Sequence, residues 1–335
     1  MTYLHKKLFT MSMMMGTIIV AASNSWITMW MGLEINLLSI IPLMSNAKNK
    51  VESESAMKYF VTQAMASTIL MLALIIMLSS NEILTTSKVT STILDLAILT
   101  KMGAAPFHFW FPEVMEGLSW TNSMIMLTWQ KIAPMMIFMH LEKSMIMMTT
   151  TIISSMLVSG IMGINQTSMR KILAYSSINH IGWMMGAMLT NQTLWMIYFT
   201  VYSLMTFNIT TMFKMLNISN IQQLINSMNK NKTIKTMFSM NFLSLGGIPP
   251  FVGFFPKWVT INSMIQEKMY LLTLIMILLT LMTLSFYMRI TFTSSIVLTT
   301  EMNTKPMITK MNNSMIVNFV ILSLLSMCPL MISFI

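Results

Sequence analysis

A ten-residue pattern rich in glycine, proline and phenylalanine occurs twice in this chain, each time inside an apolar stretch. The copies begin at Gly103 and Gly247, 144 positions apart (247 − 103), and are identical at five of their ten positions. Glycine and proline interrupt helices, and paired interrupted membrane segments are typical of transporters built from internal repeats. A broken helix exposes backbone groups inside the bilayer, where an ion can use them. The pattern therefore predicts a membrane protein with one broken helix in each of two repeats.

The composition excludes a soluble globular fold. Hydrophobic residues make up 55% of the 335 positions and charged residues only 9%, against about 25% charged in ordinary soluble domains. We expect an all-α polytopic membrane protein, a single transmembrane domain over 1–335, with about eleven transmembrane helices in two inverted repeats. The expected spans are 5–23, 26–45, 57–79, 88–117, 121–140, 145–165, 168–190, 193–215, 236–266, 269–296 and 314–334, of which 88–117 breaks near Pro106 and 236–266 near Pro249 and Pro250.

The polar segment 217–235 is expected to join the two halves, 1–216 and 236–335. Its apolar residues recur at helical spacing: Ile218, Ile221, Leu224, Ile225 and Met228. That spacing predicts a short amphipathic helix on the membrane surface. We interpret it as a linker rather than a functional site.

Cationic residues between the spans are strongly biased to one side of the membrane. One side would carry Lys6, Lys7, Lys48, Lys50, Lys58, Arg170, Lys171, Lys214, Lys230, Lys232, Lys235, Lys305 and Lys310, and the other only Lys88, Lys143 and Lys268. The richer side is the one on which a membrane protein is made, so the N-terminus is predicted there. Because these lysines act as topology signals, the net charge of +10 does not indicate nucleic-acid binding.

Methionine occurs 46 times, and we interpret this excess as codon usage in an organellar, mitochondrial gene rather than as a ligand site. The chain starts almost directly in its first span, so no transit peptide is expected, and we predict the mitochondrial inner membrane with the N-terminus in the matrix. The one cysteine, Cys328, cannot build an iron–sulfur or zinc site. Nucleotide-binding glycine motifs are absent from the sequence, so no cofactor and no metal are expected in this chain.

Three lysines and one glutamate are predicted to lie in mid-membrane: Lys101, Lys131, Lys257 and Glu34. A charge in mid-membrane is costly, which makes each a functional candidate by default. Desolvation favours the neutral amine of a buried lysine, and a nearby carboxylate favours its ammonium form. Movement of one counter-charge can therefore switch the proton affinity of a lysine, so the set predicts proton transfer. A structural ion pair is the alternative interpretation for Glu34.

Three further residues carry weaker signals. His180 lies in mid-span and suits a proton relay near neutral pH, although a hydrogen-bonded structural histidine is an equal alternative. His108 lies in the first break, where capping of an exposed carbonyl is favoured over relay. Asp95 precedes Lys101 by six residues and is interpreted as a charge near the end of its span.

Several segments together resemble a known family. They are Met31-Gly-Leu-Glu34-Ile-Asn36, Lys101-Met-Gly-Ala-Ala-Pro-Phe-His-Phe-Trp110, Trp129-Gln-Lys131-Ile-Ala-Pro134, Asn165-Gln-Thr-Ser-Met-Arg170-Lys171, Ser176-Ser-Ile-Asn-His180 and Leu243-Ser-Leu-Gly-Gly-Ile-Pro-Pro250. These segments occur in this order over nearly the whole length of the chain. By them the chain resembles the chain 2 family of mitochondrial NADH-ubiquinone oxidoreductase, and its methionine-rich composition resembles that of insect members.

The resemblance implies an antiporter-like, proton-pumping subunit of the respiratory complex, with two inverted five-helix repeats and eleven helices in animals. It places the family's key glutamate on Glu34, its broken-helix lysines on Lys101 and Lys257, and its central lysine on Lys131. Expected partners are other membrane-arm subunits, including neighbouring antiporter-like subunits, and lipids. Flavin and iron–sulfur clusters are expected in other subunits.

The residues and the resemblance together predict a mechanism. Glu34 keeps Lys101 charged until a rearrangement in a neighbouring subunit separates the pair. Lys101 then passes its proton to Lys131, through His180 or water, and Lys257 connects to the far side. The alternatives are a stand-alone cation/proton antiporter, disfavoured because no second carboxylate is evident inside the membrane, and a structural spacer subunit.

Overall fold

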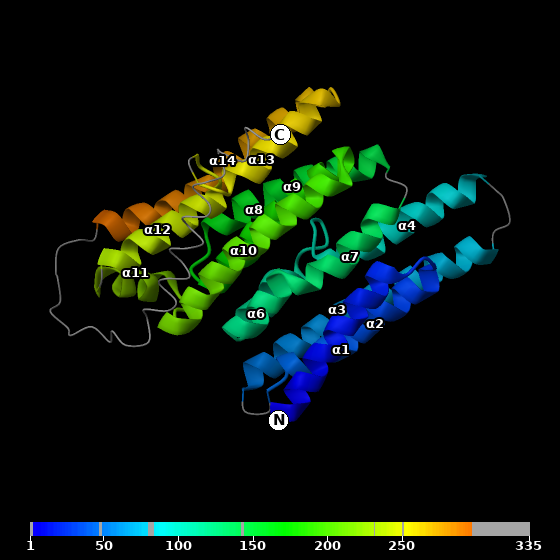
Figure 1. Cartoon of the computed structure of the whole chain (residues 1–335), viewed down its shortest axis with the longest axis horizontal. Coiled ribbons are helices and arrows are strands. Elements are labelled where there is room, and N and C mark those ends of the chain that lie inside the picture. Colours follow the sequence, from blue (N-terminus) through cyan, green and yellow to red (C-terminus); the bar gives the residue numbers. More distant parts are fainter. Residues whose placement is uncertain are drawn as a thin grey trace. The chain divides into compact units, whose positions relative to one another are not determined.

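The computed structural model describes residues 3–46, 49–79, 84–141, 144–230, 232–249 and 251–296, and over these ranges the chain forms fourteen α-helices and no β-strand (Figure 1). The helices are α1 (Tyr3–Ala22), α2 (Trp26–Met44), α3 (Lys50–Ser79), α4 (Leu84–Met102), α5 (Trp110–Gly117), α6 (Trp120–Leu127), α7 (Trp129–His140), α8 (Met145–Ile164), α9 (Met169–Thr190), α10 (Gln192–Leu216), α11 (Ile221–Lys230), α12 (Lys232–Gly246), α13 (Phe254–Gln266) and α14 (Tyr270–Ile296).

The all-α polytopic fold is confirmed. By length and apolar composition, four of the described helices can each cross a membrane: Trp26–Met44, Lys50–Met77, Met145–Ile164 and Tyr270–Thr293. Both predicted breaks are present, between α4 and α5 and between α12 and α13. The predicted span 314–334, with Cys328, and the break residue Pro250 lie outside the described residues.

The chain divides into two compact units, Met1–Thr151 and Ile152–Ile335. Each unit holds one of the two glycine/proline breaks. The division falls within α8, whereas the predicted halves were 1–216 and 236–335. A compact unit is defined by contacts within the structure, whereas a repeat is defined by similarity between two parts of the sequence. The boundaries and the inversion of the repeats therefore stay predictions.

In the first unit, α1 and α2 approach closely at two glycines. A Cβ atom on Gly16 would lie 3.0 Å from the Gly32 carbonyl oxygen, and a Cβ on Gly32 would lie 2.9 Å from the Gly16 carbonyl oxygen. Small residues allow helix backbones to approach in this way where no water drives helices together. Helix α2 also packs on α3, and α1, α2 and α3 lie side by side in Figure 1. Helix α3 in turn packs on α4, and α4 packs on α7.

Helix α9 is the centre of the second unit. All of its residues from Ile172 to Met188 are buried, and it packs against α10, α13 and α14. The segment predicted to be an amphipathic helix does form α11, and its apolar residues Leu224 and Met228 are buried. Helix α11 packs on α12 and α14; its role as a linker between halves stays a prediction.

The span predicted at 121–140 is interrupted, which the sequence analysis did not foresee. Helices α6 and α7 meet at Thr128, whose φ of −114° and ψ of −74° lie outside regular helical values. The Thr128 hydroxyl donates a hydrogen bond to the Met124 carbonyl oxygen (2.8 Å), an interaction by which threonine distorts helices. The interruption places Lys131 in the first turn of α7.

Candidate functional site

The two helix breaks begin and end at corresponding positions of the repeated pattern. In each, the first half-helix ends just before a glycine with positive φ, Gly103 at 72° and Gly247 at 76°. Glycine adopts this left-handed conformation without the steric cost of a Cβ atom. The second half-helix begins seven residues later in both copies, at Trp110 and Phe254.

Three backbone hydrogen bonds recur at the offset of 144 positions. They run from Gly103 to Thr100 and from Gly247 to Ser244, from Ala104 to Leu99 and from Ile248 to Leu243, and from Phe111 to His108 and from Phe255 to Val252. The first two pairs of bonds are the helix-ending Schellman arrangement, which satisfies part of the carbonyls that a helix end leaves free. The repeat inferred from the sequence therefore has a local structural counterpart in each unit.

The two breaks differ in the side chain that donates to a carbonyl oxygen at the end of the first half-helix. In the first, the Trp110 indole Nε1 donates to the Thr100 carbonyl oxygen at 3.1 Å. In the second, the Lys257 Nζ donates to the Gly246 carbonyl oxygen at 2.8 Å. A cation at the carbonyl end of a half-helix is also favoured by the helix dipole.

His108 lies beside a carbonyl of the first break, as the sequence analysis favoured. It is buried, and its Nδ1 is 3.2 Å from the carbonyl oxygen of Pro106. Because a carbonyl oxygen only accepts, the nitrogen is the donor in this bond. This contact is the one expected of a histidine that caps an exposed carbonyl, and the preference for capping over relay stays a prediction.

The structure brings together Glu34 of α2 and Lys101 of α4. The Lys101 Nζ lies 3.9 Å from the Glu34 Oε1, with 3% of the lysine side chain and 26% of the glutamate side chain exposed. The Glu34 Oε1 accepts no hydrogen bond from the described residues. Lys101 is the second-last residue of α4 and lies two residues before Gly103, which has the left-handed conformation. The break thus presents a buried cation to a carboxylate from another helix.

A small cavity of about 20 Å³ lies against Lys101. Its other polar lining residues are Asn36, Tyr59, Gln63 and Gln130, and a volume of this size holds about one water molecule. The Tyr59 hydroxyl donates to the Gln130 Oε1 (3.3 Å), and the Gln130 Nε2 donates to the Asn36 Oδ1 (3.0 Å). The Gln63 Nε2 is buried and has no partner among the described residues.

Lys131 follows Gln130 in α7 and is 2% exposed. Its Nζ lies 5.4 Å from the ring centroid of Phe111, the second residue of α5 in the broken helix. An ammonium over an aromatic face is attracted by the ring quadrupole. Gln130, which lines the cavity at Lys101, directly precedes Lys131 in the chain.

Lys257 and His180 belong to the second unit, where a tryptophan lies between them. The Lys257 Nζ is 5.9 Å from the ring centroid of Trp183, which is one turn after His180 on α9. The His180 Nδ1 lies 2.9 Å from the Tyr198 hydroxyl, and the His180 ring also contacts that of Tyr202 (centroids 4.9 Å apart). Both the relay and the structural interpretation of His180 are compatible with these contacts.

Asp95 is buried, which the sequence analysis did not predict. It lies eleven residues after the start of α4 and is 3% exposed, and its Oδ1 has no hydrogen-bond partner among the described residues. Its interpretation as a charge near the span end stays a prediction. The premise used against an antiporter, that no second carboxylate is evident inside the membrane, stays a prediction as well. The described residues contain no cluster of three His, Cys, Asp or Glu side chains that could hold a metal ion.

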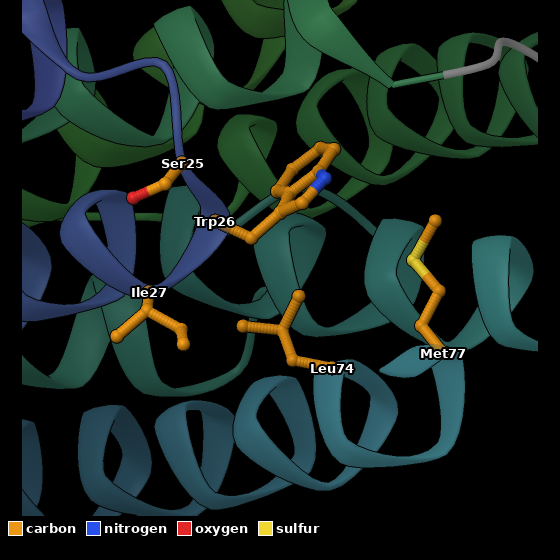
Figure 2. A pocket seen from close by; sticks show the side chains of 5 residues that line it. All are labelled: Ser25, Trp26, Ile27, Leu74 and Met77. Carbon is orange, nitrogen blue, oxygen red and sulfur yellow. The ribbon is translucent and has the colours of Figure 1, made fainter. Parts of the chain in front are cut away.

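A larger cavity in the first unit is apolar and separate from these groups. It measures about 310 Å³ and is lined by Ser25, Trp26, Ile27, Leu74 and Met77. Figure 2 shows the side chains of Trp26 and Ile27, from the start of α2, facing those of Leu74 and Met77, from the end of α3. None of these lining residues has an ionisable side chain.

The sequence analysis missed the neutral polar residues of the small cavity, Asn36, Tyr59, Gln63 and Gln130. The available signal was their position inside predicted spans, two of them next to singled-out residues: Asn36 near Glu34 and Gln130 beside Lys131. They were missed because they carry no charge. Buried amides need partners as much as buried charges do.

Comparison with known proteins identifies the family. Residues 23–283 match the family described as NADH:quinone oxidoreductase/Mrp antiporter, TM. The chain is 45% identical over 318 residues to NADH-ubiquinone oxidoreductase chain 2 of Anopheles gambiae, covering 94% of this chain and 93% of the relative. It is 44% identical over 322 residues to the protein of the same name from Locusta migratoria, covering 96% and 94%.

Solved structures share the fold at low sequence identity. A chain of respiratory complex I from Thermus thermophilus superposes with a TM-score of 0.84 at 20% identity, covering 96% of this chain and 77% of that one. A chain of the Mrp complex from Dietzia gives a TM-score of 0.73 at 16% identity, covering 84% and 59%. The buried Glu34–Lys101 pair thus lies in a chain with an antiporter-like fold, and the chain belongs to the NADH-ubiquinone oxidoreductase chain 2 family.

Proposed function

We propose that this chain is a proton-translocating membrane-arm subunit of respiratory NADH:ubiquinone oxidoreductase. The observation that carries the proposal is the Glu34–Lys101 pair, 3.9 Å apart at a helix break and against a water-sized polar cavity. A pair placed at a break can separate when the half-helices shift, because few backbone hydrogen bonds hold the break itself. Membership in the chain 2 family and the antiporter-like fold support this proposal.

The magnitude of the interaction suits the task. Two unit charges 3.9 Å apart attract by about 4 kcal/mol at an effective dielectric constant of about 20. Moving one charge against the membrane potential costs about 2.3 kcal/mol per 100 mV. Separation of this single pair therefore changes the proton affinity of Lys101 by an amount comparable with the work of translocation.

The path begins at Lys101 and continues through the small cavity towards Lys131. A water in the cavity can accept a proton from the Lys101 Nζ, with the amides of Gln63 and Gln130 orienting it. Lys131, adjacent to Gln130, is the next amine in the first unit. Lys257, with His180 on α9, is proposed as the corresponding proton-carrying site of the second unit. Lysine suits each station because it releases a proton when buried, which arginine does not do in proteins.

The redox chemistry is proposed to take place in other subunits, which hold the flavin and the iron–sulfur clusters, so this chain carries no cofactor of its own. Its partners are the other membrane-arm subunits, including neighbouring antiporter-like subunits, and lipids. We place the chain in the mitochondrial inner membrane with its N-terminus in the matrix, on the basis of its methionine-rich composition and the bias of its cationic loops.

The test compares two variants of the buried pair with a surface control. Glu34→Gln and Lys101→Met each remove one charge from the pair, whereas Lys58→Met removes an exposed lysine that bridges Glu54 and Glu113 at 3.2 Å. The assembled complex is reconstituted in vesicles, and the protons moved per NADH oxidised are measured. We expect a lower ratio in both pair variants and an unchanged ratio in the control. An unchanged ratio in both pair variants, with normal assembly, would refute the proposal.

A further inference from the structure

A buried carboxyl group outside the Glu34–Lys101 pair remains without a function. Asp95 is 3% exposed, and its Oδ1 has no hydrogen-bond partner among the described residues. The side chains one turn further along α4, Ile98 and Leu99, are buried and apolar. An isolated carboxylate in such surroundings is strongly unfavourable, and such groups are found neutral or paired.

No cation pairs with Asp95 in the described part of the chain. The ion pairs there join Lys58 to Glu54 and Glu113, and Lys101 to Glu34. Of the helices packed on α4, α3 carries Lys50 and Lys58 and α7 carries Lys131 and His140. None of these groups comes within ion-pair distance of the Asp95 carboxyl. A proton on the carboxyl itself is then the remaining way to remove its charge.

The position of Asp95 on α4 suits the transfer of this proton along the helix. Asp95 lies six residues before Lys101, or about 9 Å along the helix axis at about 1.5 Å per residue. It lies eleven residues after Leu84, where α4 begins, or about 16 Å. A carboxyl group at this depth divides the distance between Lys101 and that end of the helix into two shorter steps.

We propose that Asp95 is a further proton-carrying group of the membrane interior, held as a neutral acid between Lys101 and the membrane face at which α4 begins. In the step proposed, Lys101 has passed its proton towards Lys131, and the Asp95 carboxyl gives its own proton, through water along α4, to the neutral Lys101 amine and becomes a carboxylate. A proton from water on the side of that face restores the acid. Each cycle leaves Asp95 unchanged and moves one proton past it. The direction of this step rests on the proposed function, whereas the neutral state of Asp95 does not.

Infrared spectroscopy of the assembled complex tests the neutral state directly. Asp95→Asn replaces the acid by an amide of nearly the same shape. In the wild-type minus variant difference spectrum we expect the C=O band of a protonated carboxyl group, shifted when the sample is exchanged into heavy water. Carboxylate bands in its place would overturn the inference. If the asparagine variant does not assemble, Asp95→Glu serves the same comparison, because it keeps the acid and moves the band.

Proton translocation tests whether Asp95 carries protons. We expect Asp95→Asn to lower the protons moved per NADH oxidised and Asp95→Glu to restore most of the loss. A normal ratio in Asp95→Asn alongside a lowered ratio in Lys101→Met would overturn the role of Asp95 and leave the proposed function intact. A normal ratio in both variants would contradict the proposed function as well, so the two failures are distinguishable.

Discussion

The repeated break permits a matched pair of substitutions. Gly103 and Gly247 occupy the same position in their breaks, with φ of 72° and 76°. Alanine at either position would hold a Cβ in the left-handed region, which costs about 1–2 kcal/mol. This strain is common to Gly103→Ala and Gly247→Ala, so it cancels when the two variants are compared.

The surroundings of the two glycines differ. A Cβ on Gly247 would lie 2.8 Å from the Lys257 Nζ, whereas a Cβ on Gly103 would meet only ring and side-chain carbons of Trp110 and Phe111, at 3.2 Å and beyond. Gly247→Ala must therefore displace the lysine from the Gly246 carbonyl oxygen, to which it donates at 2.8 Å. A hydrogen bond to a charged group contributes about 1.5–3 kcal/mol. We expect Gly247→Ala to be more destabilising than Gly103→Ala by about this amount.

The assay follows the assembled complex. Its half-life at elevated temperature and the protons moved per NADH oxidised are measured for the wild type and both alanine variants. We expect Gly247→Ala to shorten the half-life more and to lower the proton ratio, and Gly103→Ala to leave the ratio closer to that of the wild type. Equal losses in the two variants would refute the reasoning, because they would show that backbone strain alone accounts for the effect.

Three further predictions follow from single contacts. Gly32→Val should reduce the amount of assembled complex on native gels, because even a Cβ would lie 2.9 Å from the Gly16 carbonyl oxygen; normal assembly would contradict the close packing of α1 on α2. Trp110→Phe removes the indole donor to the Thr100 carbonyl (3.1 Å), which keeps its bond from the Gly103 N–H. It should therefore destabilise the first break by about 0.5–1.5 kcal/mol, seen as faster thermal inactivation; an unchanged rate of inactivation would contradict a contribution of the indole bond. Gln63→Leu should slow proton translocation with little loss of assembly, because it removes an amide that lines the cavity at Lys101; an unchanged rate would exclude a role for the cavity.

Much of the fold follows from local sequence patterns. Long apolar stretches have few solutions in a bilayer other than helices, because every backbone group must be satisfied within the segment. The breaks were predictable because each pattern combines a glycine with a proline two or three residues later, and the two residues together favour the end of a helix. The interruption at Thr128 was not predictable, because threonine is common in regular membrane helices and its hydroxyl bond to Met124 depends on the local backbone.

The candidate site was predictable in its charges and not in its neutral groups. Glu34 and Lys101 stood out because ionisable residues are rare in membrane spans, and the ion pair between them is observed. The lining of the small cavity depends on which faces of α2, α3, α4 and α7 meet, which is tertiary information. The burial of Asp95 was not predictable for a related reason: it depends on which helices pack on α4.

The most direct test of proton translocation through this chain is the number of protons moved per NADH oxidised by complexes that carry Lys131→Arg and Lys131→Met. Arginine keeps the positive charge but does not release a proton, and methionine removes the charge. If Lys131 carries protons, both variants lower the ratio while NADH oxidation by an artificial acceptor persists. A wild-type ratio in Lys131→Arg, in a fully assembled complex, would show that Lys131 serves only as a fixed charge and would contradict the proposed path.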